Sequence, residues 1–206
     1  MLRVWNNVYA DAKENGTALA WELENIERGK PTIIKHLLRY LDVGRIGLEL
    51  ACGRGQNIKY LINKGKEMYG SDISSVAVAQ SGLKNVICAE STDTPFETGF
   101  FDFIIDIGGF HHIERKNRSK YITEVCRLLK THGYFAFSCF DTLDPYNTAN
   151  KWAVSKYGLY VNFSTLAELR TLFEKKFKIK EVIKITWPST KNRDHSAIGM
   201  ICQTKS

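Results

Sequence analysis

The chain has 206 residues, and its 29 Lys and Arg against 22 Asp and Glu give a formal net charge of +7. Hydrophobic residues make up 44% and charged residues 25%, a globular composition that excludes a disordered or fibrous chain. No stretch approaches the roughly 18 consecutive apolar residues of a membrane span, and the first residues lack the charged and apolar segments of a secretion signal. The length predicts a single domain over residues 1–206.

The positive charge is confined to the C-terminal part of the chain. Residues 1–150 hold 18 basic and 18 acidic side chains, whereas residues 151–206 hold 11 and 4, which accounts for the whole surplus. Between Lys176 and Lys184 the lysines fall mostly at even positions among apolar residues, which predicts one exposed face of a strand. Docking of nucleic acid on these lysines is the alternative.

The five cysteines are scattered and contain no C-x-x-C pair. An odd number at such spacings favours neither a disulfide framework nor a zinc site. We therefore expect no bound metal, and a reducing, cytoplasmic location.

The elements expected before residue 141 alternate between helix and strand. Residues 1–43 are mostly helical, with a helix that begins at Pro31 and is closed by Gly44. Strands are expected at 46–51, 67–72, 86–89, 101–107 and 134–140, with helices through 58–62, 74–81 and 117–130. This alternation with short turns predicts an α/β fold, a Rossmann-like doubly wound and mostly parallel sheet.

The alternation of predicted helices and strands ends after residue 140. Residues 141–163 are irregular and rich in Tyr, Asn and Asp, as expected of an insertion that covers a substrate. Ser164 is expected to cap a helix through Phe173, and an antiparallel pair of strands is expected near 177–186 and 196–203. The predicted division is an N-terminal lid (1–43), a cofactor-binding core (44–140), the insertion, and a C-terminal part (164–206).

A glycine-rich turn follows the first strand in the segment ELACGRG, residues 49–55. Its glycines allow a ligand to approach the backbone closely, and the next helix begins with free N–H groups. Asp72 ends the following strand, where a carboxylate can accept both hydroxyls of a ribose. The sequence thus predicts a cofactor that contains a nucleoside.

Two residues bear on which nucleoside cofactor binds. Ile58 stands where the dinucleotide fingerprint has its third glycine. Glu49, inside the strand before the turn, would repel a pyrophosphate and attract a ligand ammonium group. A cofactor with a positive amine is therefore favoured, and a nicotinamide oxidoreductase is the disfavoured alternative.

Five segments together resemble the class I S-adenosylmethionine-dependent methyltransferases. They are 49–55 (ELACGRG), 69–74 (YGSDIS), 88–96 (CAESTDTPF), 101–113 (FDFIIDIGGFHHI) and 128–133 (LLKTHG). The first is similar to the family's E-x-G-x-G-x-G motif with Ala51 in place of the first glycine, a mild change if its φ is negative. The resemblance covers roughly residues 45–140 and implies the Rossmann-like fold, S-adenosylmethionine as cofactor and methyl transfer as activity.

The resemblance also implies roles for individual residues. Glu49 and the backbone at Ala51, Gly53 and Gly55 would hold the methionine portion of the cofactor. The nucleoside would be bound by four further residues, with Asp72 on the ribose, Ile73 packed on the adenine, and Glu90 and Ser91 at the adenine edge. Asp106 or its backbone would close the pocket, and the aromatic residues Tyr9 and Trp21, with Trp5, would wall it.

The segment DIGGFHH, residues 106–112, resembles small bacterial enzymes akin to thiopurine and halide methyltransferases. His111 lies just beyond the fourth strand and is the candidate general base, if the acceptor must lose a proton. His112 is more typical of a structural residue, and His195, in a polar stretch, is expected to be simply exposed.

These observations predict a methyltransferase that acts on a small-molecule acceptor by in-line displacement, with residues 1–43 and 141–163 over the site. Two alternatives stay open. One is an RNA or protein methyltransferase that docks its substrate on the basic C-terminal part, and the other is a domain that binds S-adenosylmethionine without catalysis. The sequence leaves the oligomeric state open.

Overall fold

The computed structural model describes residues 2–19, 32–42, 44–189 and 193–205. The helices are α1 (Leu2–Glu14), α3 (Thr32–Leu37), α4 (Gln56–Ile62), α5 (Ser75–Ser81), α6 (Arg118–Leu128) and α7 (Leu166–Phe173), with 3-10 turns η1 (Leu38–Tyr40), η2 (Phe110–His112) and η3 (Arg115–Asn117). The strands are β1 (Ile46–Leu50), β2 (Glu67–Asp72), β3 (Val86–Cys88), β4 (Phe101–Ile107), β5 (Leu129–Phe140), β6 (Trp152–Val154), β7 (Tyr160–Asn162), β8 (Phe177–Trp187) and β9 (His195–Thr204).

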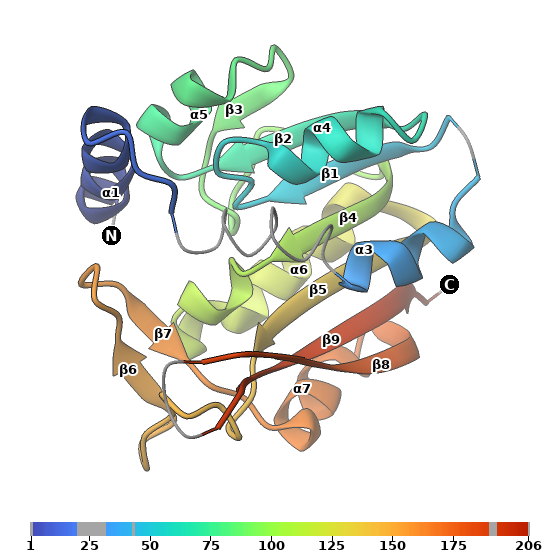
Figure 1. The fold of residues 1–206 in the computed structure, drawn as a ribbon. Coiled ribbons are helices and arrows are strands. Elements are labelled where there is room, and N and C mark those ends of the chain that lie inside the picture. Colours follow the sequence, from blue (N-terminus) through green and yellow to red (C-terminus); the bar gives the residue numbers. More distant parts are fainter. Residues whose placement is uncertain (1, 20–31, 43, 190–192, 206) are drawn as a thin grey trace.

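The central sheet has seven strands in the order β3-β2-β1-β4-β5-β9-β8. The pairs among β3, β2, β1, β4 and β5 are parallel, while β9 is antiparallel to both β5 and β8. This confirms the predicted Rossmann-like sheet with its antiparallel C-terminal pair (Figure 1). The chain moves outward from β1 in one direction and returns at β4 to build the other half, so the strand order reverses between β1 and β4. Ligands of such sheets bind at this reversal, beyond the carboxyl ends of the strands.

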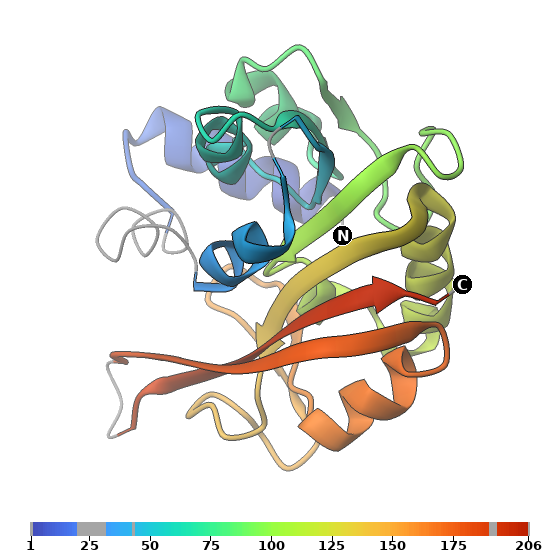
Figure 2. The same cartoon turned by 90° about the vertical axis from the view of Figure 1, so that its right-hand side faces the viewer.

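Helices cover both faces of the sheet (Figure 2). On one face, α3 and α4 bury Ile34, Leu37 and Leu61 against side chains of β2, β4, β5 and β9. On the other face, α6 and α7 bury Tyr121 and Phe173 in a cluster dominated by aromatic rings of β4 and β5. Both clusters are continuous along the sheet, which makes it a rigid platform for the loops at its edge.

Three boundaries differ from the sequence-based expectation. Helix α6 ends at Leu128 and β5 begins at once with Leu129, because the 129–133 segment is extended and turns through His132 at φ 61°. Thr165, not Ser164, caps α7: its hydroxyl accepts from the Glu168 N–H, and the Glu168 carboxylate accepts from the Thr165 N–H.

The 141–163 segment is more ordered than its composition suggested. It contains the antiparallel hairpin β6–β7, in which the Trp152 and Tyr160 rings stack 5.3 Å apart. The hairpin is fastened to η2, because the Asn162 amide donates to the His111 carbonyl at 3.1 Å and His112 Nδ1 donates to the Tyr160 carbonyl at 2.7 Å. The insertion is therefore tied to the loop that follows β4.

The β8 lysines are exposed but do not share one face, which corrects the sequence-based expectation. Lys178 lies opposite Gln203 and Lys184 opposite Ile198, and these two partners are five positions apart on β9. Because side chains alternate along a strand, an odd separation puts the two lysines on opposite faces of the sheet. The cause is an irregularity of register between Ile179 and Glu181, which shifts the alternation at Lys180.

We expect Gly47→Ala to destabilise the sheet, because Phe103 on β4 lies across from Gly47 and its ring atoms come within 2.2–2.7 Å of where a Cβ at residue 47 would stand. Overpacking of this kind costs about 1–3 kcal/mol of unfolding free energy. Denaturant unfolding measures the loss, and adding Phe103→Leu should restore part of it. An unchanged unfolding midpoint in Gly47→Ala would contradict this packing.

Candidate active site

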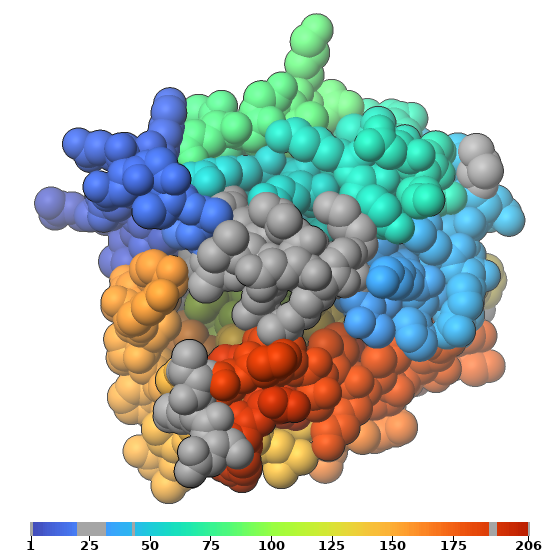
Figure 3. Space-filling model, in the orientation of Figure 1, coloured from blue at the N-terminus to red at the C-terminus, as the bar shows by residue number. Residues whose placement is uncertain are grey.

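A cavity of about 610 Å³ lies at the carboxyl edge of the sheet. Its walls come from α1, from the loops after β1, β2, β3 and β4, from the end of β5, from the β6–β7 hairpin, and from the adjoining ends of β8 and β9. In Figure 3 the blue N-terminal helix lies above the orange β6–β7 hairpin at the left, and the red β8–β9 pair lies to the right of the hairpin. The cavity thus extends along the edge of the sheet from β3, past the point between β1 and β4 where the strand order reverses, to β8.

The turn after β1 forms one side of the cavity with three residues in the left-handed region. Ala51 has φ 52°, Gly53 φ 53° and Gly55 φ 70°. The positive φ of Ala51 is the strained case, in which a Cβ costs roughly 1–2 kcal/mol. Ala51 and Gly53 line the cavity, while Gly55 lies behind it at the start of α4, against Leu83.

Asp72 is buried at the end of β2 and lines the cavity. One carboxylate oxygen accepts from the Gly53 N–H and the other from the Ser74 N–H, both at 2.8 Å. Burial raises the pKa of Asp72, and these two hydrogen bonds oppose that rise. Each oxygen keeps a second lone-pair direction, so the carboxylate can accept two further hydroxyl donors.

Glu49 is 2% exposed and sits at the end of β1 in the cavity wall. Its Oε1 accepts from the Asn57 amide at 2.8 Å, whereas its buried Oε2 has no hydrogen-bond partner among the described residues. Burial raises the pKa of Glu49 to about 8, with the Asn57 hydrogen bond working in the opposite direction. An unpartnered buried carboxyl oxygen of this kind is suited to a cationic ligand group.

The other residues predicted to hold a cofactor fall into three groups. Tyr9, Ile73, Glu90 and Ser91 line the cavity, together with Trp5, whose ring stacks on Tyr9 at 6.2 Å. Trp21 lies outside the described residues. Asp106 lies beneath the cavity and not in its lining.

Asp106 instead shapes the loop after β4. It is fully buried and accepts from the Gly109 N–H at 2.6 Å, the Phe110 N–H at 3.1 Å and the Tyr121 hydroxyl at 2.6 Å. Burial raises the pKa of Asp106 to about 6 against the pull of these donors. The carboxylate therefore fixes the start of η2, which carries His111 and His112.

His111 and His112 both line the cavity and are both desolvated. The pKa of His111 is held well below 6.5 by burial and by the nearby His112 and Arg118, and its Nδ1 has no hydrogen-bond partner among the described residues. Burial lowers the pKa of His112 to about 4, and its ring packs edge-on to Trp5 at 5.0 Å. Both histidines are therefore neutral at pH 7.

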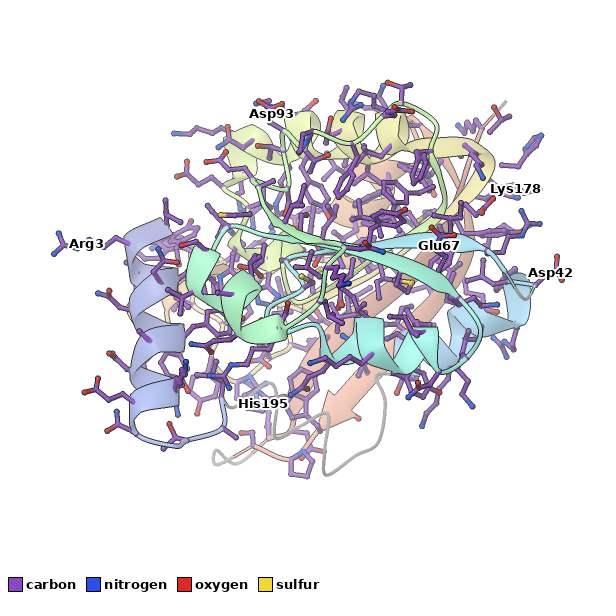
Figure 4. The ribbon with its side chains drawn as sticks, turned by 90° about the horizontal axis from the view of Figure 1, so that it is seen from above. Arg3, Asp42, Glu67, Asp93, Lys178 and His195 are labelled. Carbon is purple, nitrogen blue, oxygen red and sulfur yellow. The ribbon has the colours of Figure 1, made fainter. Side chains whose placement is uncertain are left out.

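The sequence-based interpretation missed an acid–histidine pair at the far end of the cavity. His195, expected to be simply exposed, lines the cavity and places its Nδ1 2.9 Å from Oδ2 of the buried Asp144. The labelled His195 lies at the opposite end of the β8–β9 pair from Lys178 (Figure 4). Only the antiparallel course of β9 brings its first residue to this edge, so a polar local sequence could not reveal it.

Among the described residues, no group of three or more His, Cys, Asp or Glu side chains could hold a metal ion. No helix in the described part of the chain has the length and apolar character that crossing a membrane requires.

Residues 48–137 match the family model described as "Methyltransferase domain". Two curated relatives, from Schizosaccharomyces pombe and Saccharomyces cerevisiae, bear the name tRNA (carboxymethyluridine(34)-5-O)-methyltransferase. The first is 31% identical over 114 residues (53% of this chain, 49% of the relative), and the second 31% over 120 residues (55% and 42%). The chain thus spans about half the length of the curated relatives it matches.

Solved structures extend the likeness of fold to the whole chain. The Burkholderia thailandensis 1,6-didemethyltoxoflavin-N1-methyltransferase, solved with 1,6-didemethyltoxoflavin and S-adenosylhomocysteine, superposes with a TM-score of 0.73 at 17% identity, covering 99% of this chain and 88% of that one. A SAM-dependent methyltransferase from Methanosarcina mazei superposes with a TM-score of 0.71 at 20% identity, covering 82% and 96%.

We expect the unfolding free energy of this protein to depend on pH through the buried Glu49. Because burial raises its pKa from 4.5 to about 8, the folded state holds a proton that the unfolded chain has already released between these values. The stability contributed by this group is thus fully present below pH 4.5 and is lost as pH rises towards 8. Glu49→Gln removes the titration, so the unfolding free energy of the variant relative to the natural protein should increase from pH 5 to pH 8.

Urea unfolding of the ligand-free protein at several pH values provides the measurement. Glu67→Gln, a change at an exposed glutamate that starts β2, is the matched control. A difference between Glu49→Gln and the natural protein that stays constant over this range would contradict the desolvated state of Glu49.

Proposed function

We propose, from the premise that this chain belongs to the class I S-adenosylmethionine-dependent methyltransferases, that it transfers a methyl group from S-adenosylmethionine to a neutral small-molecule acceptor. The observation that carries the proposal is a single cavity with two chemically distinct halves. The half beside β1, β2 and β3 is acidic, and the half at the ends of β5, β8 and β9 is formed by aromatic and histidine side chains.

The acidic half fits the cofactor group by group. The unpartnered Oε2 of Glu49 would accept the ammonium group of the methionine portion, and the two free lone-pair directions of Asp72 would accept the ribose hydroxyls. Ile73 would pack on the adenine, with Glu90 and Ser91 at its edge. When bound, the cofactor supplies an electrophilic methyl group on a sulfonium. This chain has to orient that methyl group and exclude water around it.

The aromatic rings of α1 suit a positively charged sulfur. Tyr9 is 3% exposed, and its hydroxyl lies 2.6 Å from where a Cβ at Gly53 would stand, so the ring covers the glycine turn directly. Trp5 extends this wall to His112. Aromatic faces attract a cation by about 0.5–2 kcal/mol, and α1 would thus contribute to binding as well as shield the site.

The second half of the cavity favours an uncharged acceptor. Phe140, Trp187 and His195 lie together there, with ring centroids 5.0–6.3 Å apart. Among the described lining residues no lysine occurs, and the one arginine, Arg54, donates to Gln80 at the cofactor side. A carboxylate acceptor would find no described lysine or arginine at this end of the cavity, whereas a flat neutral ring can stack. His111 would lie beside such a ring as a neutral hydrogen-bonding group.

A tRNA acceptor is the second candidate, favoured by the names of the two yeast relatives. It needs a basic surface beside the cavity mouth. The lysines of β8 point from both faces of the sheet, and Lys178 lies at the end of the strand away from the cavity (Figure 4). This distribution favours the small-molecule acceptor.

We expect S-adenosylmethionine and S-adenosylhomocysteine to bind, and binding at pH 7 to release close to one proton. With a pKa of about 8, Glu49 is protonated at pH 7, and contact with the ligand ammonium would favour its ionised form. Calorimetric titration in buffers of different ionisation enthalpy counts the proton. Asp72→Asn should weaken binding about 10- to 100-fold, as expected for lost hydrogen bonds to a charged group, and leave the proton release in place.

Glu49→Gln should abolish the proton release and weaken binding. Failure of both ligands to bind the natural protein would refute the proposed function, and full-strength binding in Asp72→Asn would refute the ribose assignment.

We expect methyl transfer to neutral ring compounds that carry a hydroxyl, thiol or ring N–H. A product-mass screen with the full chain compares these compounds with aliphatic and aromatic carboxylates and with unmodified and carboxymethylated tRNA. Transfer confined to tRNA, with a binding strength that falls steeply as salt rises, would replace the small-molecule assignment. Tight cofactor binding with no transfer to any class would mark a non-catalytic binding domain.

A further inference from the structure

We infer that His195, oriented by Asp144, is the general base that removes a proton from the acceptor. The inference deepens the proposed function and rests on it, because it concerns the acceptor half of the same cavity. Three observations carry it: the hydrogen bonds that hold Asp144, the nitrogen of His195 that they leave free, and the position of the ring at the cavity wall.

The carboxylate of Asp144 is buried and held in one orientation by hydrogen bonds. Its side chain is completely buried and comes from the segment that follows β5. Oδ1 accepts from the Tyr146 N–H at 2.9 Å, and Oδ2 accepts from the Ser196 N–H at 3.0 Å. Two backbone donors thus hold the carboxylate in one orientation, and His195 Nδ1, 2.9 Å from Oδ2, is its only side-chain donor among the described residues.

This arrangement determines which nitrogen of His195 carries the proton. A carboxylate that already accepts two backbone N–H groups can only accept from His195, so Nδ1 is the donor. In neutral imidazole the other nitrogen then bears the lone pair. Nε2, on the side of the ring away from Asp144, is therefore the free basic nitrogen.

The ring is held at the cavity wall by its neighbours. It stacks on Tyr146, with centroids 5.2 Å apart and planes 14° apart, and on Trp187, at 5.0 Å and 23°. The Phe140 ring lies 6.3 Å from His195 and 4.6 Å from His111, so the two histidines flank one aromatic side chain of the acceptor half. A flat acceptor beside Phe140 would have Nε2 of His195 within reach.

The other two histidines of the cavity, His111 and His112, have no carboxylate partner among the described residues that would stabilise an imidazolium. His111 has no carboxylate within hydrogen-bond distance among the described residues, and Arg118 is near enough to oppose a second positive charge. His112 commits Nδ1 to the Tyr160 carbonyl and packs against Trp5, so it holds the β6–β7 hairpin and α1 in place. His195 alone of the three has a counter-charge for an imidazolium.

Atoms and charges balance in the step this implies. The acceptor oxygen, nitrogen or sulfur forms a bond to the methyl carbon as the bond from that carbon to the sulfonium breaks, and the electron pair of the broken bond stays on sulfur. The acceptor proton passes to Nε2 of His195, and the resulting imidazolium keeps its Nδ1–H on Asp144. Solvent then takes the proton. The acceptor must therefore carry an O–H, N–H or S–H group that is un-ionised when it binds.

The described groups that face His195 from the neighbouring elements are one carboxylate and uncharged rings. Asp144 faces it directly. Among the described residues, Asp141 is linked to this site through Ser196, whose hydroxyl donates to Asp141 Oδ2 at 3.3 Å. From β8 and β5 the ring meets the uncharged Trp187 and Phe140.

The test uses 4-nitrophenol, whose phenolate absorbs visible light, as a probe for the acceptor half of the full chain saturated with S-adenosylhomocysteine. If Nε2 is the base, the bound probe should be more ionised than the free probe at the same pH. His195→Gln should lose this excess ionisation, because the Gln amide can still donate to Asp144 but has no basic nitrogen. Asp144→Asn should lose most of it, and His132→Gln, a change at an exposed histidine outside the cavity, should lose none.

Turnover supplies the second readout. With an un-ionised acceptor from the screen, His195→Gln should lower kcat/KM by about 10²- to 10⁴-fold, the usual contribution of a general base. With an acceptor that is fully ionised in solution it should lower kcat/KM far less. A structural role for His195 would lower both alike.

The outcomes separate the two proposals. If neither S-adenosylmethionine nor its product binds, the proposed function fails. If the product binds but the probe does not, or if His111→Gln and not His195→Gln removes the excess ionisation, the proposed function stands and the assignment of His195 is overturned.

Discussion

Strand direction is the constraint on which the whole site depends. Five parallel strands end at one edge of the sheet, and β9, which runs the other way beside β5, begins at that same edge. Asp72 is the last residue of β2 and Glu49 the last but one of β1, whereas His195 is the first residue of β9. One edge of the sheet therefore brings together Glu49, Asp72 and His195, although no two of these residues are close in the sequence.

Carboxyl groups are buried at this edge of the sheet, and the structure compensates for their loss of water in two ways. Asp72, Asp106 and Asp144 each accept two backbone N–H groups, so the loops that carry them are organised around a carboxylate. Glu49 differs, because one of its oxygens is buried without a donor among the described residues. The first three carboxylates therefore have hydrogen-bond donors from the fold on both oxygens, whereas the second oxygen of Glu49 would need a ligand as its partner.

The core of the fold was predictable because its signals are local. Apolar runs of strand length, glycine turns and acids at strand ends gave β1, β2 and β4 with correct bounds or within one residue. That Glu49, Asp72 and the glycine turn meet at one edge was predictable too, since they belong to consecutive elements, and their role in holding a cofactor stays a prediction. The Ala51 conformation was beyond reach, because its positive φ results from the loop as a whole and not from the identity of the residue.

The proposed acceptor half of the cavity could not be predicted, because it depends on how distant strands pair. Asp144 and His195 are separated by 51 residues and lie in stretches whose composition is simply polar. Their meeting requires β5 and β9 to pair antiparallel in the register that sets Phe140 opposite Ala197, and no local pattern fixes that register. The same dependence explains the lysines of β8, where one irregularity of register divides what looked like a single charged face.

In the proposed reaction, the two halves of the cavity would balance different charges. A sulfonium cofactor brings positive charge, which the acids at β1 and β2 can balance, and methyl transfer removes the charge on sulfur while it releases a proton from the acceptor. That proton needs a destination that does not disturb the first half. Asp144 and His195 lie at the opposite end of the cavity, after β5 and on β9, which are two and three sheet positions from β1. Their separation would let the charge that appears at the acceptor be compensated locally, without titrating Glu49 or Asp72.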